Sequence, residues 1–155
     1  MTTNSRRGFV VAAPAVKHAI HAAIDAEVET SHEDVPVSYG YPTGGLQPEH
    51  IWIGGAFNAA TPRYVSGGLQ RDEAGEVEVF VSVVWRDPDM TEAEDRAVVL
   101  SQLVEDAVST DPTLGGTVQE AHVAGVQGDV ATPDDHSLQY GLVLKVAYQT
   151  TVVLV

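Results

Sequence analysis

The C-terminal stretch of this chain is a strand-like run that is apolar on one face. From Leu138 onward the even-numbered positions are almost all apolar or aromatic, and the pattern continues to Leu154. Alternation with a period of two is typical of a strand that buries one face. Residues 151–155 read Thr-Val-Val-Leu-Val, whereas most chains end in polar residues that fray. The chain must therefore place its last strand inside a sheet or against a partner.

The length of this strand adds a second constraint. At about 3.3 Å per residue, residues 138–155 span about 55–60 Å. A compact domain of this chain length has a diameter of about 40 Å. We therefore expect the strand either to bend, with Gly141 as the candidate position, or to leave the body of the domain. A projecting end would have an apolar face and an unpaired edge that need a partner.

Periodicity along the rest of the chain predicts an α+β fold with the order α-β-β-β-α-β-β. The predicted helices cover residues 14–29 and 91–109, and the strands cover residues 35–41, 50–57, 76–86, 117–130 and 138–155. The links between successive strands contain no helix, so we expect a mainly antiparallel sheet with both helices packed on one face. The length predicts one domain, 9–155, after a flexible N-terminal arm, 1–8.

Two features lie within and directly after the second predicted strand. Gly54 and Gly55 within a strand-like run indicate a bulge. Residues 58–75 contain a proline and several glycines, and we expect them to form a long mobile loop. The loop includes Arg63 and Arg71 in a chain with few basic residues, so it is either a functional loop that contacts a partner or a passive one.

The composition excludes several classes of protein. The 155 residues contain no cysteine, which excludes disulfides and thiolate metal sites. No apolar run approaches the roughly 20 residues that cross a bilayer, so we expect an intracellular protein without a membrane partner. The formal charge of −14 disfavours tight nucleic-acid binding, which needs Lys and Arg at phosphates. The charge fits either general solubility or a surface that DNA passes without adhering.

The pattern of chemical groups does not indicate a catalytic site. His18 and His21 share a helix face with Asp25 but lack a further ligand of metal-site type, and we interpret them as a solvated face. No nucleophile elbow and no phosphate-binding loop is present in the sequence. Trp52 and Trp85 lie at strand positions and are expected to pack in the core. We therefore expect no enzyme activity, no cofactor and no metal, and favour an assembly or binding role.

One local pattern resembles a known family. Residues 111–116 read Asp-Pro-Thr-Leu-Gly-Gly, directly after a predicted helix and before a strand. Pro112 can end the helix, and Gly115 and Gly116 permit backbone angles that other residues resist. Together with the strand at 80–85 and a Val-x-Tyr-x-Thr strand at 146–150, this pattern resembles the tail terminator (tail completion) proteins of long-tailed bacteriophages. The resemblance extends over about residues 10–155 in element order and is most specific at 104–118 and 140–152.

The resemblance implies a virion structural protein of the tail neck, assembled in the host cytoplasm. Such a protein forms a ring, usually a hexamer, that caps the tail tube and joins it to the head, while DNA passes through the lumen without specific binding. Its partners would be other copies of the chain, the tail tube protein and a head-tail connector protein. From the basic loop and the apolar C-terminus, we expect subunit or partner contacts at Arg63, Tyr64, Arg71, Thr151, Val153 and Val155.

Two other functions remain open at the level of sequence. The first is another head-tail connector, a stopper or head-completion protein, which has the same charge and the same need to assemble. The second is an α+β domain that binds a small ligand. That function requires an apolar cavity with a few convergent polar groups.

Overall fold

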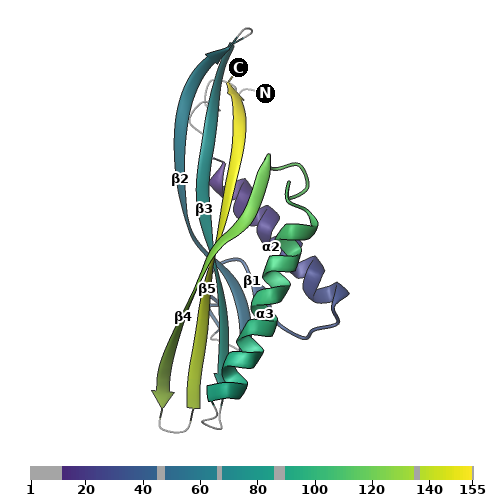
Figure 1. The fold of residues 1–155 in the computed structure, drawn as a ribbon, viewed down its shortest axis with the longest axis vertical. Coiled ribbons are helices and arrows are strands. Elements are labelled where there is room, and N and C mark those ends of the chain that lie inside the picture. Colours follow the sequence, from purple (N-terminus) through teal and green to yellow (C-terminus); the bar gives the residue numbers. More distant parts are fainter. Residues whose placement is uncertain (1–11, 45–47, 66–67, 86–89, 135–136, 155) are drawn as a thin grey trace.

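The computed structural model describes residues 12–44, 48–65, 68–85, 90–134 and 137–154 (Figure 1). Within these ranges the elements are α2 (Ala13–Thr30), β1 (Val37–Ser38), β2 (Glu49–Val65), β3 (Gly68–Trp85), α3 (Met90–Thr110), β4 (Glu120–Asp134) and β5 (Ser137–Leu154). The α+β class and the predicted order of elements are confirmed. The N-terminal arm predicted at 1–8 lies outside the described residues.

The strands form one sheet with the order β1-β2-β3-β5-β4. The short strand β1 runs parallel to β2, and the other neighbours are antiparallel, so the sheet is mixed. The register between β2 and β3 shifts between Ile53 and Ala56, which confirms the bulge predicted at Gly54 and Gly55. Beyond the bulge, β2 and β3 stay paired from Ala56 with Val77 to Val65 with Gly68.

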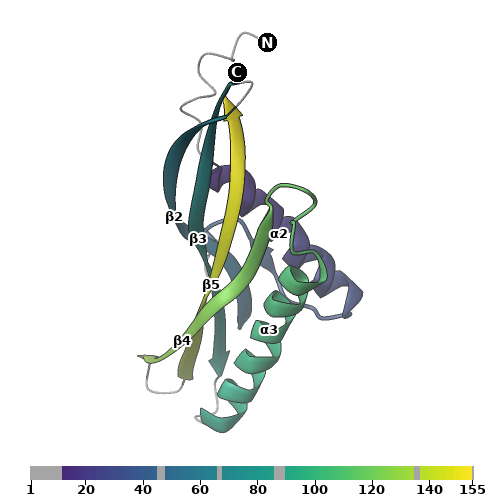
Figure 2. The same ribbon diagram turned by 45° about the horizontal axis from the view of Figure 1, so that its top comes forward.

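Both helices pack on one face of the sheet (Figures 1 and 2). The apolar stripe of α2 contributes Val16, Ile20 and Ile24 to the same buried cluster as the stripe of α3. The sheet contributes alternate residues of its central strands, Val77, Val79, Val81 and Val83 of β3 and Leu142, Leu144, Val146 and Tyr148 of β5. The period-two pattern of the closing strand therefore marks the face that the helices cover. Neither α2 nor α3 is long and apolar enough to cross a membrane.

The prediction of a long mobile loop at 58–75 is wrong, because almost all of these residues form strands. β2 continues to Val65 and β3 begins at Gly68, and the paired residues run from Asn58 with Gly75 up to Val65 with Gly68. The end of β5 pairs with the same part of β3, from Tyr148 opposite Gly75 to Leu154. We call these three paired stretches, 58–65, 68–75 and 148–154, the arm. The sequences of 58–65 and 68–75 lack apolar alternation because the upper part of the arm extends beyond both helices (Figure 1).

The turn after α3 explains the pattern at 111–116. The backbone φ angles of Leu114, Gly115 and Gly116 are 50°, 69° and 85°, three successive left-handed residues. The Asp111 carboxylate accepts a hydrogen bond from the backbone N–H of Gly115 at 2.7 Å. Leu114 is 3% exposed and belongs to the core cluster, as expected for a side chain that folds back onto the helix end. The turn thus sets the path of the chain from α3 into β4.

The lower end of the sheet is held by Arg96 of α3. Its guanidinium lies 2.7 Å from Glu33, after α2, and 2.5 Å from Glu49, at the start of β2. The hydrogen bonds to Glu49 and Glu33 raise the pKa of Arg96, and the bond from Arg96 lowers the pKa of Glu33. These contacts join α3 to the segment after α2 and to the first residue of β2.

Candidate assembly surface

A network of polar side chains lies at the root of the arm, on the helix side of the sheet. The Glu73 carboxylate accepts hydrogen bonds from the Ala12 backbone N–H at 2.7 Å, from Asn58 at 2.9 Å and from Arg71 at 2.7 Å. The side chain of Glu73 is fully buried and that of Arg71 is 11% exposed. The Tyr148 hydroxyl donates to the amide oxygen of Asn58. The network therefore joins β2, β3, β5 and the start of α2.

Glycine at position 75 permits this arrangement. Gly75 of β3 lies between Asn58 of β2 and Tyr148 of β5 in the register of the sheet. A Cβ atom at position 75 would lie 2.7 Å from the Tyr148 hydroxyl and 2.2 Å from the backbone oxygen of Phe57. The tyrosine ring therefore crosses β3 over a residue that has no side chain and reaches the amide on the far strand.

The environment of the network shifts two pKa values. Burial raises the pKa of the Glu73 carboxyl, but the donors Ala12, Asn58 and Arg71 together outweigh burial, so its pKa is lowered from the usual value. Burial, with the negative charge of Glu73 nearby, raises the pKa of Tyr148 to about 12. At neutral pH the carboxylate is thus ionised and the phenol is protonated, which matches the observed donors and acceptors.

The outer edge of β5 in the arm has no neighbouring strand among the described residues. β4 pairs with β5 only as far as Gln149, where Gln119 N–H donates to the Gln149 carbonyl. Backbone groups alternate between the two sides of a strand. Because Gln149 faces β4, the next odd-numbered residues, Thr151 and Val153, direct their N–H and C=O groups to the open side. The even-numbered residues between them bond to β3.

The opposite edge of the arm is formed by β2, and it differs from the β5 edge because it contains a proline, Pro62. The N–H of Val84 donates to Pro48, so even-numbered residues of β3 face β2. After the bulge, their partners in β2 are odd-numbered, as in the pairs of Thr61 with Asp72 and Ala59 with Ala74. Pro62 is even-numbered and therefore directs its backbone nitrogen to the open side. Proline at an edge removes an outward donor and hinders pairing with another strand, so β5 has the less protected edge.

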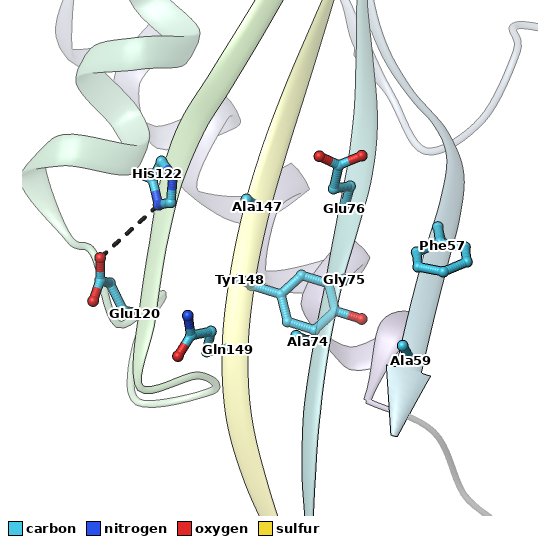
Figure 3. A pocket seen from close by; sticks show the side chains of 10 residues that line it. All are labelled: Phe57, Ala59, Ala74, Gly75, Glu76, Glu120, His122, Ala147, Tyr148 and Gln149. Atoms are coloured by element: carbon cyan, nitrogen blue, oxygen red, sulfur yellow. Dashed lines mark ion pairs between the residues drawn. The ribbon is translucent and has the colours of Figure 1, made fainter. Parts of the chain in front are cut away.

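The face of the sheet opposite the helices is partly apolar and hollowed. Trp52 stacks on Phe80 with ring centroids 5.1 Å apart, and Tyr41 meets the Trp52 ring edge-on at 5.4 Å. Trp52 thus lies on this open face and not in the helix-side core, contrary to the expectation, while the side chain of Trp85 lies outside the described residues. Nearer the arm, a hollow of about 340 Å³ is lined by residues of four strands, with Phe57 67% exposed at its rim (Figure 3).

The arm brings together the interface residues predicted from two distant parts of the sequence. Arg63 and Val153 both align with Gln70, and Tyr64 aligns with Leu69 one rung further along. Arg71 aligns with Val152, although its side chain is engaged with Glu73 on the helix side. Thr151 donates to Asp72 at 2.9 Å and accepts from Gln119 at 3.2 Å. Val155 lies outside the described residues, and a partner contact at any of these positions stays a prediction.

Sequence reasoning missed Asn58, Glu73 and Tyr148 as a unit. Arg71 and Glu73 are two positions apart, which places them on the same face of a strand, but this signal is visible only once 58–75 is recognised as strand. The contact between Asn58 and Tyr148 joins residues 90 positions apart and has no local signature.

The other chemical candidates are used in packing. His18 stacks on Tyr39 with ring centroids 4.3 Å apart, and His21 donates to the Val37 carbonyl at 3.2 Å. His18 is exposed, as expected for a solvated helix face, whereas His21 is partly buried and is used in a backbone contact. Within the described ranges, no group of three or more His, Asp or Glu side chains is arranged to hold a metal ion.

Comparison with known proteins finds similar chains among the solved structures. No protein-family model matches the chain, and no curated protein matches it. Among solved structures, a chain described as "Virion of native gene transfer agent (GTA) particle" aligns with a TM-score of 0.39 and 12% sequence identity. The alignment covers 86% of this chain and 93% of that chain.

Proposed function

We propose that the protein is a structural subunit of a phage-like particle, and specifically a tail terminator. In this function several copies form a ring that caps the tail tube and joins it to the head. The sequence pattern at 104–118 and 140–152 suggests this family. The observation that carries the proposal is the arm, whose β5 edge directs the backbone groups of Thr151 and Val153 to the open side.

An open, regular strand edge is the part of a sheet most ready to pair with another chain. In a closed ring each subunit contacts its neighbours through two different surfaces, because the contact is head-to-tail. The arm offers the edge of β5 as one such surface. The proline on the β2 edge makes that edge a poorer partner, so the two edges of the arm differ in the way that a directional contact requires.

The charge of the chain supports passage of DNA through such a ring. With 22 acidic residues against 8 basic ones, the protein has few groups that can neutralise phosphates. We propose that DNA moves through the lumen without specific binding. We also propose no catalytic function, since the buried Glu73 and Arg71 are fully engaged in holding the arm.

The proposal predicts different effects for proline on the two edges of the arm. Val153→Pro removes an outward N–H from β5, and Ala60→Pro removes an outward N–H from β2 a few rungs away. We expect the wild type and Ala60→Pro to form a ring alone or on a tail tube, and Val153→Pro to remain monomeric. Light scattering after size exclusion, with and without the tube protein, measures the mass.

The fold of each variant is checked by circular dichroism and thermal unfolding, and only folded variants are compared. A folded Val153→Pro that assembles like the wild type would reject the β5 edge as the contact. A wild type that stays monomeric with and without tube protein would reject the ring itself. Electron microscopy of particles without the protein separates a terminator, which leaves overlong or unjoined tails, from a stopper, which leaves heads that leak DNA.

A further inference from the structure

Two adjoining hollows lie on the open face of the sheet at the root of the arm. Their volumes are about 340 and 310 Å³, and they share Ala59, Ala74 and Gln149. We call the combined surface the trough. Its floor consists of Ala59, Ala74 and Ala147 on three neighbouring strands. In Figure 3 larger side chains surround that floor, namely Phe57, Glu76, His122 and Gln149. A surface of this form can accept a short extended segment.

The trough is acidic. Its lining includes Glu76, Glu120 and Asp72, and neither lysine nor arginine is among the lining residues. No hydrogen bond or ion pair joins Glu76 to another described residue, although Glu76 is half-buried. A half-buried carboxylate next to exposed apolar surface favours a cationic and partly apolar occupant.

The chain itself contains such a segment. Residues 1–11 precede the described part and include Arg6, Arg7 and Phe9, and the first acidic residue of the whole chain is Asp25. The end of this segment is fixed at the arm, because the Ala12 N–H is bonded to Glu73 at 2.7 Å. Glu73 is on the helix side of β3, and its neighbours Asp72 and Ala74 line the trough on the other side.

The distance also fits. Arg7 and Arg6 are five and six residues before Ala12, which is about 17–20 Å of extended chain at about 3.3 Å per residue. Passing around the edge strand β2 to β3 requires about 15–20 Å, since a sheet layer is about 10 Å thick and strands are about 4.8 Å apart. The arginines can thus reach Glu76 on β3, and the short tether gives a local concentration in the millimolar range.

We propose that residues 6–11 of the same chain pass around the edge of β2 and bind in the trough, with Arg6 and Arg7 at Glu76 and Phe9 over the alanine floor. The segment covers part of the open face of the sheet and neutralises part of its charge. This inference is independent of the proposed function, because it concerns one chain only.

Disulfide trapping tests the proposal, since the native chain contains no cysteine. Gly8→Cys is combined with Ala59→Cys in the trough, or with Ala60→Cys, the next residue of the same strand, which faces the other side. In a glutathione redox buffer we expect the Ala59 pair to form an intrachain disulfide at least about tenfold faster than the Ala60 pair. Non-reducing electrophoresis separates the intrachain product from a crosslinked dimer.

Charge variants complete the test. Glu76→Lys should remove the advantage of the Ala59 pair, and adding Arg6→Glu with Arg7→Glu should restore it. Glu94→Lys, an exposed change of equal charge on α3, should have no effect. Equal rates for the two cysteine pairs, or an advantage that Glu76→Lys leaves unchanged, would overturn the proposal. A product that is mainly dimer would also overturn it, because the occupant would then be the segment of a second copy.

Discussion

At the scale of single residues, the junction of arm and body depends on a glycine, Gly75 of β3. Tyr148 reaches Asn58 across β3 only because position 75 is glycine. The hydroxyl and the amide are then satisfied in a site where burial would otherwise make both costly. Close packing is therefore what requires glycine at position 75. Its backbone conformation does not require glycine, since its φ angle is not in the left-handed region.

We predict that Gly75→Ala destabilises the fold by about 1–3 kcal/mol, because the new methyl group forces Tyr148 and the β2 backbone to move. The matched control is Gly125→Ala in β4, where a Cβ atom meets no other atom within 4 Å. We expect the control to change stability by no more than about 0.5 kcal/mol. Urea unfolding followed by tryptophan fluorescence measures both, and equal effects would argue against the crossing of Tyr148.

At the scale of elements, the turn at 111–116 converts the end of α3 into the approach to β4. Asp111 binds the backbone of the turn, and Leu114 anchors it in the core. Three successive left-handed residues would be costly without glycine at two of them. The motif that suggested the family is thus a device for setting the angle between a helix and a strand.

The geometry of the turn predicts that a side chain at Gly116, its last left-handed residue, lowers the stability of the fold. Gly116→Ala should destabilise the protein by about 1–2 kcal/mol, since φ at this position is 85° and alanine resists that angle. Gly44→Ala is the control, because Gly44 also has open space around its Cβ position but no left-handed backbone. Thermal unfolding of the two variants should differ, and an equal midpoint would show that the turn adjusts without cost.

At the scale of the whole molecule, a helix-backed sheet continues into an uncovered arm. The body is stabilised by the apolar cluster, but the arm is joined to it by strand pairing and by the buried charges of Glu73 and Arg71. Removing one partner of such a buried pair leaves the other uncompensated, which costs about 3–5 kcal/mol. The same link holds the first residues of α2 to the sheet through Ala12.

This link makes part of the stability dependent on pH. The folded-state pKa of Glu73 is below its ordinary value of 4.5, so ionised Glu73 stabilises the fold above that pH, and the contribution is lost as the pH falls through the folded-state pKa. We expect Glu73→Gln to be less stable than the wild type at pH 7, and the difference to shrink below about pH 4.5. Urea unfolding from pH 3 to 7 measures the difference in the free energy of unfolding between the two proteins.

Glu29→Gln, at an exposed position of α2, serves as the control for Glu73→Gln and should follow the wild type more closely. A difference between wild type and Glu73→Gln that stays constant over this pH range would show that the carboxylate is not the source of the stabilisation.

The sequence by itself determined the elements that pack against one another. The stripes of α2 and α3 and the alternation in β3 and β5 report burial directly, so the α+β order, the bulge at Gly54 and Gly55 and the turn at 111–116 could all be predicted from residues close in sequence. The arm could not be predicted in the same way. Residues 58–75 have no face against the core, so their strand pairing leaves no periodic signal, and proline and glycine there are typical of loops.

Only the tertiary structure decided what the end of the chain does. It pairs residues 148–154 with β3, brings Tyr148 to Asn58, and leaves the backbone of Thr151 and Val153 on an open edge. The length of the closing strand already implied that it would bend or project. It projects because it pairs with the part of β3 that continues, together with β2, beyond the helices. That pairing joins residues far apart in the sequence, so no local pattern reveals it.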